Sequence, residues 1–190
     1  MATNSIDVTA SAARNLIKRD VAESAQYLTF HLAGEQYGID ILKVQEIRGW
    51  TPVTQMPNAP AFVRGVMNLR GTIVPVIDLR LRFGLETVAY TKTTVVIVVT
   101  VDSASGSRII GAVVDGVSDV LNVDEADIQP APDFGTAVQT DFISGLVMVD
   151  ANMAMLLDVD RLMSIEELFA LETVRRSSAP FEVAETELAA

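Results

Sequence analysis

Short runs of alternating or continuous aliphatic residues, separated by Gly, Pro and Asn, indicate a mostly β protein. Valine is frequent in these runs, and its branched side chain fits a pleated strand better than a helix. Gly, Pro and Asn between the runs are typical of turns. The pattern predicts ten short strands at 27–32, 36–41, 44–50, 66–69, 72–77, 93–101, 108–114, 121–123, 143–149 and 151–159.

Three places depart from the strand pattern. Ile41, Val44 and Ile47 are spaced three apart, which predicts a single helical turn or a bulge between Ile41 and Val44. We expect a short helical link at 57–64. Ser164 and the acid three residues later have the spacing of a capping box, so a short C-terminal helix is predicted to begin there and to cover the barrels.

The sequence repeats itself once. Gly38 aligns with Gly111 at an offset of 73 residues, and Gly65 aligns with Gly145 at an offset of 80. One pair of copies predicts two related five-stranded β-barrels with a groove between them. We expect the first lobe at about 26–92 and the second at about 93–160, with an exchange of strands between them as an open alternative.

Both ends of the chain are expected to lie outside this fold. The segment 1–25 mixes charged and small residues and is predicted to be flexible. A single domain is expected over 26–168, followed at 169–190 by the end of the helix and a disordered tail. No secretory pattern is visible at the start of the chain, and the longest aliphatic runs are far shorter than the ~20 residues that span a bilayer.

Charge divides unevenly along the chain, whose net charge is −11. Residues 26–92 carry seven basic and five acidic side chains, a net +2, whereas 93–160 carry one basic and eleven acidic side chains, a net −10. The negative total would repel a phosphate backbone, so we expect no nucleic-acid partner. The acids of the second half form either a solvated face or a surface that meets a different partner from the first half.

Residues for catalysis are few. The chain has no Cys, and its one histidine, His31, alternates with apolar residues and is expected on a strand's outward face. No phosphate-binding loop, dinucleotide fingerprint or nucleophile elbow occurs. We therefore expect no cofactor, no metal and no enzymatic activity. A small acidic β-barrel enzyme with paired carboxylates is the alternative that a sequence leaves open.

Two long strings carry a family resemblance. YGIDILKVQEIR (37–48) and RGVMNLRGTIVPVIDLR (64–80), together with IIGAVVDGVSDVL (109–121), resemble the CheW chemotaxis coupling family over about 26–168. The resemblance implies two Src-homology-3-like barrels with a groove between them. Related modules form the regulatory domain of the CheA kinase and the N-terminal domain of CheV proteins, which are the alternatives within binding modules.

What the resemblance implies for function is a cytoplasmic adaptor without catalysis. Such an adaptor binds the cytoplasmic tip of a methyl-accepting chemoreceptor and the regulatory domain of a CheA-type histidine kinase, in arrays recruited to the membrane through these partners. It inserts no segment of its own into the membrane, and self-association within arrays is an added expectation. We expect the main kinase contact on the 26–92 half, whose charge is nearly balanced.

Within the matching strings, Arg70 and Glu46 are expected to form a polar pair near the receptor-binding groove. Ile41 and Val44 are expected to line that groove and to accept apolar residues of a receptor helix. Each has a simpler alternative, since the aliphatic pair could be ordinary core and the polar pair a structural surface contact. Gly65 and Gly71 are interpreted as turn glycines that support these surfaces.

Overall fold

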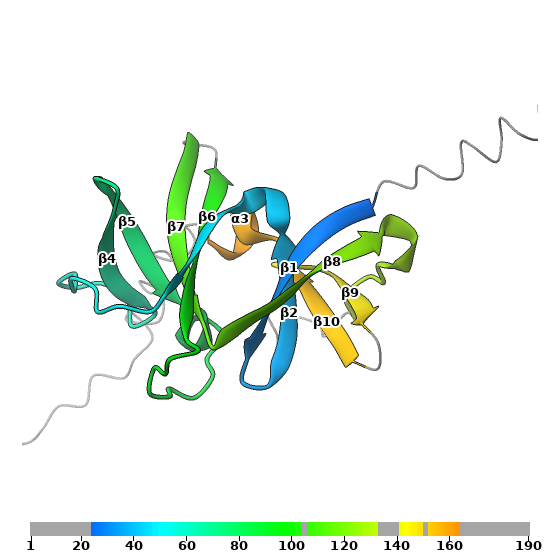
Figure 1. The fold of residues 1–190 in the computed structure, drawn as a ribbon, viewed down its shortest axis with the longest axis horizontal. Helices are drawn as coiled ribbons and strands as arrows, with labels where there is room; N and C mark the ends of the chain where they lie inside the picture. Colours follow the sequence, from blue (N-terminus) through cyan, green and yellow to red (C-terminus); the bar gives the residue numbers. More distant parts are fainter. Residues whose placement is uncertain (1–23, 104–105, 133–140, 150–151, 164–190) are drawn as a thin grey trace, which may run out of the picture.

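The computed structural model describes residues 24–103, 106–132, 141–149 and 152–163. Within them, ten strands form two five-stranded sheets (Figure 1). One sheet has the order β8-β1-β2-β10-β9, with bounds Gly116–Asp124, Ser24–Leu32, Glu35–Asp40, Asn152–Leu157 and Ile143–Val149. The other has the order β3-β6-β7-β5-β4, with bounds Val44–Gly49, Val95–Ser103, Gly106–Val114, Thr72–Asp78 and Val63–Leu69.

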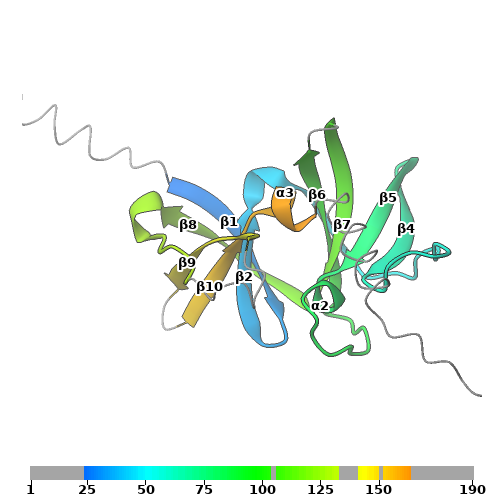
Figure 2. The same cartoon turned by 180° about the vertical axis from the view of Figure 1, so that it is seen from behind.

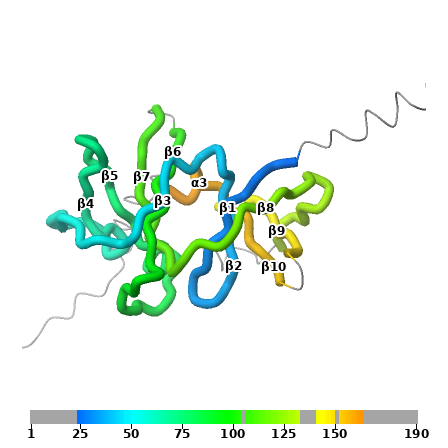
Figure 3. Tube along the Cα trace, viewed as in Figure 1, coloured from blue at the N-terminus to red at the C-terminus, as the bar shows by residue number. Residues whose placement is uncertain are grey.

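The two lobes do not follow the predicted division at residue 92. The β3–β7 sheet comes from the continuous segment 44–114 and is called the central lobe. The other sheet takes β1 and β2 from before this segment and β8 to β10 from after it, and is called the terminal lobe (Figure 3). The boundaries 26–92 and 93–160 are wrong because the chain crosses between sheets after β2 and again after β7, so strands are exchanged as the alternative allowed.

One hydrophobic core joins the lobes. Phe30 and Leu32 of the terminal lobe and Ile97 and Ile110 of the central lobe are at most 1% exposed and belong to the same cluster. Each lobe also has a smaller cluster of its own, around Val98 in the central lobe and around Leu156 in the terminal lobe. The shared core makes the lobes one packed body, because separating them would expose a large apolar area to water.

The repeat is visible as two equivalent corners. Asp78 ends β5 and caps the helix Leu79–Arg82 (α2), while Asp158 follows β10 and caps the helix Val159–Leu162 (α3). Each carboxylate accepts hydrogen bonds from two backbone N–H groups of its helix. Figure 2 shows α3 at the junction between the lobes and α2 beside β5. Neither short helix was predicted from the sequence, whose apolar pattern there continues from the strand.

The irregular segments were predicted with mixed success. The helical turn between Ile41 and Val44 is confirmed as the 3₁₀ helix Ile41–Lys43 (η1). The helical link at 57–64 is wrong, since this stretch forms turns that lead into β4. Just before this stretch, Thr54 forms an antiparallel bridge with Val66 of β4, which holds the chain extended there. The prolines within the stretch also lack the backbone N–H that a helix needs. The predicted capping box at residue 164 lies outside the described residues.

Candidate functional site

A tight turn between β4 and β5 presents Arg70 at the surface. Arg70 and Gly71 have positive φ angles of 51° and 91°, as in the two-residue hairpin turns that match the twist of antiparallel strands. Asn68 Oδ1 accepts a hydrogen bond from the backbone N–H of Gly71 at 2.7 Å, which fixes the turn. The Arg70 side chain is 84% exposed, so its guanidinium is open to a partner.

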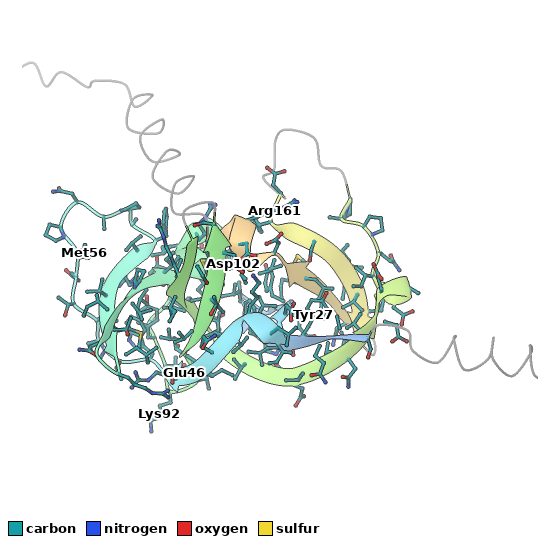
Figure 4. All side chains as sticks on the ribbon, turned by 90° about the horizontal axis from the view of Figure 1, so that it is seen from above. Tyr27, Glu46, Met56, Lys92, Asp102 and Arg161 are labelled. Atoms are coloured by element: carbon teal, nitrogen blue, oxygen red, sulfur yellow. The ribbon has the colours of Figure 1, made fainter. Side chains whose placement is uncertain are left out.

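Glu46 on β3 pairs with Arg70 as the sequence predicts. Arg70 Nη2 donates to Glu46 Oε2 at 2.6 Å, and Arg48 Nε lies 3.7 Å from the other carboxylate oxygen. The Glu46 side chain is partly buried, and Figure 4 shows it on the central lobe. β3 and β4 are the two end strands of their sheet. Because Glu46 lies on β3 and Arg70 directly follows β4, their ion pair links the two opposite edges of that sheet.

The crossing from β2 to β3 carries the two aliphatic residues assigned to the groove. Ile41 and Val44 are partly buried and pack against the core that joins the lobes. Leu42 between them is 85% exposed, and its backbone N–H donates to the Asp40 carboxylate at 2.8 Å. The structure therefore gives Ile41 and Val44 a packing role, while Leu42, which the sequence analysis missed, is the apolar side chain presented to solvent.

Lys43 fixes this crossing to both lobes. Its ammonium donates to Asp102 at the end of β6 at 2.7 Å and to Asp160 in α3 at 2.8 Å. The backbone N–H of Asp102 also donates to Asp160, at 2.8 Å. The hydrogen bond to Asp102, then that to Asp160, raises the pKa of Lys43 to about 12, so the cation persists at neutral pH. Figure 4 shows Asp102 near the middle of the molecule, where the lobes meet.

Several further apolar side chains of the central lobe face solvent. Ile73 is 62% exposed on β5, Met56 is 52% exposed in the loop before β4, and Ile47 is 42% exposed on β3. The sequence analysis treated Ile47 and Ile73 as ordinary strand residues and assigned no role to Met56. The structure shows all three exposed, although a polar side chain is usual on a face that meets water.

Gly65 and Gly71 differ in what they require. Gly65 has a φ of 139° at a bulge in β4, and a Cβ atom there would overlap the backbone carbonyl of Thr54. Gly71 also has a positive φ, but nothing lies within 4 Å of the place a Cβ would take. Gly65 is thus a close-approach glycine inside the sheet, and only Gly71 is a turn glycine as predicted.

Asp115, between β7 and β8, ties the lobes together on the side of α2. Its carboxylate accepts two hydrogen bonds from Arg80, both at 2.6 Å, and one from the backbone N–H of Ala33 at 2.8 Å. Burial alone would raise the pKa of Asp115, but the bonds from Arg80 and Ala33 outweigh it and hold that pKa below its ordinary value of 3.8. The ion pair is therefore complete at neutral pH.

The described residues include one histidine and no cluster of metal-binding side chains. His31 is exposed, as expected for an outward face, and its Nε2 lies 2.7 Å from Ser118 Oγ. Across the described ranges, no three His, Asp or Glu side chains are placed to hold a metal ion. No described helix is long and apolar enough to cross a membrane.

Two small β-barrels that share a core and present Arg70, Leu42 and the exposed aliphatics on their surface define a two-lobed interaction module. The CheW-like domain model matches residues 26–167. The chain therefore belongs to the CheW-like domain family, with the fold of two Src-homology-3-like barrels that the resemblance implied.

Named relatives agree with this assignment. The chain is 47% identical over 152 residues to the chemotaxis protein CheW of Klebsiella aerogenes, covering 80% of this chain and 89% of that protein. It is 39% identical to the chemotaxis protein CheW of Rhizobium meliloti, covering 75% and 89%. The solved structure of the scaffolding protein TtCheW from Thermoanaerobacter tengcongensis is similar with a TM-score of 0.66 and 34% identity, covering 73% and 87%.

Proposed function

We propose that this protein is a chemotaxis coupling adaptor that joins chemoreceptor cytoplasmic tips to a CheA-type histidine kinase and performs no catalysis itself. The observation that carries the proposal is the family match over 26–167, which spans both lobes. Free-standing CheW relatives, 89% of whose length is covered in two cases, favour this reading over a CheV-like or kinase-regulatory module.

Receptor binding is assigned to the surface around Arg70 and Leu42. A receptor tip is a helical hairpin, and helix recognition uses exposed apolar anchors beside polar groups that fix orientation. Leu42, 85% exposed, supplies the anchor, and the Arg70 guanidinium, 84% exposed, supplies directional donors. Glu46 holds the guanidinium in place, while Ile41 and Val44 support the crossing from beneath.

Kinase binding is assigned to the central lobe. Residues 44–114 carry seven basic and four acidic side chains, a net +3, whereas 24–43 and 115–163 together carry two basic and twelve acidic ones, a net −10. The charge asymmetry noted along the sequence is thus one between the lobes. An interface centre is depleted in charge and rich in apolar side chains, and Ile47, Met56 and Ile73 lie on the central lobe.

The adaptor would act in the cytoplasm and reach receptor arrays through these two partners. Association between copies of the protein, using barrel surfaces that the kinase also presents, remains part of the proposal. Such contacts would be made by side chains at the ends of the lobes.

A binding experiment tests the proposal directly. Purified receptor cytoplasmic fragments and the kinase regulatory domain are each titrated with the protein in a calorimeter, and kinase activity is assayed with all three present. We expect both partners to bind and the kinase to respond to receptor only with the adaptor. Saturable ATP binding by the protein alone at micromolar concentration, or failure to bind either partner, would contradict the proposal.

A further inference from the structure

A pocket of 480 Å³ opens at the far end of the terminal lobe, away from the assigned receptor and kinase surfaces. It lies between β8 and β9, the two end strands of their sheet. Leu121 and Val123 of β8 form one wall, Val147 and Val149 of β9 form the other, and Ala126 and Asp127 of the 3₁₀ helix Glu125–Asp127 (η2) form the rim. The size is in the range of ordinary ligand pockets, about 300–1,000 Å³.

The pocket exists because the terminal lobe is incompletely closed. Among the described residues, no pairing joins β8 to β9, and the outer edge of β9 is met only by Gln129, in the segment after η2, which exchanges two backbone hydrogen bonds with Leu146, both 2.8 Å. Beyond that bridge neither edge pairs with another strand. An open edge with an apolar wall beside it is a place where a further chain segment can add.

In the central lobe the equivalent space is filled. Trp50, Val53 and Leu69 pack there against the lobe's own cluster. Tyr90, from the segment that leads into β6, closes it: its ring lies 4.2 Å from that of Trp50, and its hydroxyl donates to buried Asp78 at 2.6 Å. Burial, then the bond to Asp78, raises the pKa of Tyr90 well above its ordinary value of 10.0.

The repeat shows why the terminal lobe is left open. At the offsets of 73 and 80 residues, Trp50 and Leu69 correspond to Val123 and Val149, which are smaller. Val53, which precedes the Thr54–Val66 bridge, corresponds to Ile128, which precedes the Gln129–Leu146 bridge. The two smaller residues remove side-chain volume from the β8 wall and from the β9 wall of the pocket. An open pocket with apolar walls exposes nonpolar surface to water, which is unfavourable unless another group covers it.

The counterpart of Tyr90 belongs to the N-terminal segment. Within each lobe β6 and β1 are equivalent strands, since β6 pairs β7 as β1 pairs β2. Val98 faces Gly111 and Thr29 faces Gly38, so the offset between these strands is 98 − 29 = 69 residues. Tyr90 then corresponds to Val21, in the stretch that leads into β1 just as Tyr90 leads into β6.

We propose that residues 14–21 of the same chain, with the sequence RNLIKRDV, dock into this pocket and close the terminal lobe. Leu16, Ile17 and Val21 supply apolar side chains for its walls, and Arg14, Lys18 and Arg19 supply positive charge. Asp127 lines the pocket and is exposed, and the exposed Asp124 and Glu125 lie next to lining residues in the chain, so the surroundings of the rim are acidic. Apolar filling and charge complementarity thus favour the same segment.

The connection is short enough for this docking. Ser24, the first residue of β1, pairs with Asp124 at the rim, and Figures 1 and 3 show the start of β1 beside the end of β8. The pocket lies across β8 from β1, about two strand spacings or ~10 Å away. Val21 precedes Ser24 by three residues, and three extended residues span ~10 Å, which is sufficient to bring Val21 to the pocket.

The C-terminal segment is the other occupant to consider, and its charge opposes binding at an acidic rim. Residues 164–190 carry six Glu and two Arg, a net −4, whereas the proposed segment 14–21 carries three basic side chains and one acid, a net +2. Like charges across a contact are unfavourable, and a tether raises the local concentration of both segments alike.

A disulfide test in the full-length protein is clean because the chain contains no Cys. In the first variant Ile17→Cys is combined with Met148→Cys, on an exposed residue that lines the pocket. In the matched control Ala170→Cys replaces Ile17→Cys; residue 170 follows Met163 by as many residues as Ile17 precedes Ser24, since 170 − 163 and 24 − 17 are both 7. Under mild oxidation we expect the first variant to form an intramolecular bond at least about tenfold faster than the control.

Adding Lys18→Glu and Arg19→Glu to the first variant should slow that bond about fivefold or more, and adding Glu125→Lys and Asp127→Lys as well should restore the rate. Equal rates for the variant and the control would overturn the proposal. So would a rate that the charge reversal leaves unchanged, or a product that forms only between two copies at high protein concentration. None of these readouts depends on receptor or kinase, so the result is separate from the proposed function.

Discussion

Gly65 and Gly71 differ in the space that surrounds their Cα atoms. Gly65 sits where another backbone passes too closely for any side chain, while Gly71 needs only a positive φ angle. The difference is invisible in the sequence, in which each glycine follows an arginine. It separates a residue that the sheet requires from one that only the turn prefers.

Gly65→Ala should therefore destabilise the protein far more than Gly71→Ala. We expect losses in the free energy of unfolding of about 3 kcal/mol or more for the first and about 1 kcal/mol for the second. Urea denaturation followed by the fluorescence of Trp50, the single Trp, measures both. Comparable losses would mean that the backbone of Thr54 can move aside and that Gly65 is an ordinary turn residue.

Arg70→Ala tests a side chain whose role is recognition. Its ion pair with Glu46 is exposed on the arginine side, and such surface pairs contribute about 0–1 kcal/mol, so stability should change little. Receptor affinity should fall about tenfold, as for an arginine anchor at an interface. Calorimetry with a receptor fragment, beside a thermal melt, separates the two effects.

Arg161→Ala is the matched control, because Arg161 of α3 is also exposed and also paired, with Asp158, the N-cap residue of that helix. It should leave receptor affinity unchanged. If Arg70→Ala behaves like this control, or if its lost affinity only follows unfolding, the receptor assignment is refuted.

Two short connections between secondary-structure elements fix the position of one lobe relative to the other. The turn between β7 and β8 supplies Asp115, which binds α2 through Arg80 and the β1–β2 turn through Ala33. The η1 crossing supplies Lys43, which binds β6 and α3. Both crossings of the chain between lobes are thus fastened by charge-assisted hydrogen bonds.

Asp115→Asn should lower stability in a pH-dependent way. Because the pKa of Asp115 is lower in the folded than in the unfolded protein, its contribution is present at neutral pH and is lost as the pH falls through the folded-state value, below about 4. We expect a cost of about 1–2 kcal/mol at pH 7, shrinking progressively between about pH 5 and pH 2. Urea denaturation across this range measures it.

Asp124→Asn serves as the comparison, since Asp124 is exposed and its side chain makes no capping bond to η2. Its effect should be small at every pH. A cost for Asp115→Asn that stays constant down to pH 2 would show that the carboxylate's charge is not what fastens the lobes.

The whole molecule is a body with two electrically different lobes. The central lobe is mildly positive and exposes aliphatic side chains, while the terminal lobe concentrates the acids. Exposed charges act over a Debye length of ~8 Å at physiological salt, whereas buried apolar contacts are little affected by salt at this level. Ionic strength can therefore distinguish which lobe a partner uses.

Kinase affinity should change by less than about threefold between 50 and 300 mM salt if the kinase docks on the apolar surface of the central lobe. Self-association through the acidic lobe should respond clearly over the same range. Titrations of both associations at several salt concentrations give the comparison. If kinase affinity depends steeply on salt while self-association does not, the kinase uses the acidic terminal lobe and our assignment of the lobes is wrong.

Local patterns in the sequence were sufficient to predict the β class, most strand positions, the η1 turn and the family resemblance. Strand periodicity depends only on neighbouring side chains, so 143–149 was predicted with the bounds that β9 has. The Glu46–Arg70 pair could be proposed because both residues lie in strings typical of one family, and the structure places them 2.6 Å apart.

Tertiary structure alone decided which strands share a lobe and which glycine is indispensable. A strand's partner is chosen by packing and backbone pairing between distant segments, and nothing in β3 or β8 by itself records that each crosses to the other sheet. The exposure of Leu42 and the close approach of Thr54 to Gly65 likewise arise only when separate segments meet in space. The sequence alone determined the kind of elements and the family, while long-range contact decided their assembly and the surface they present.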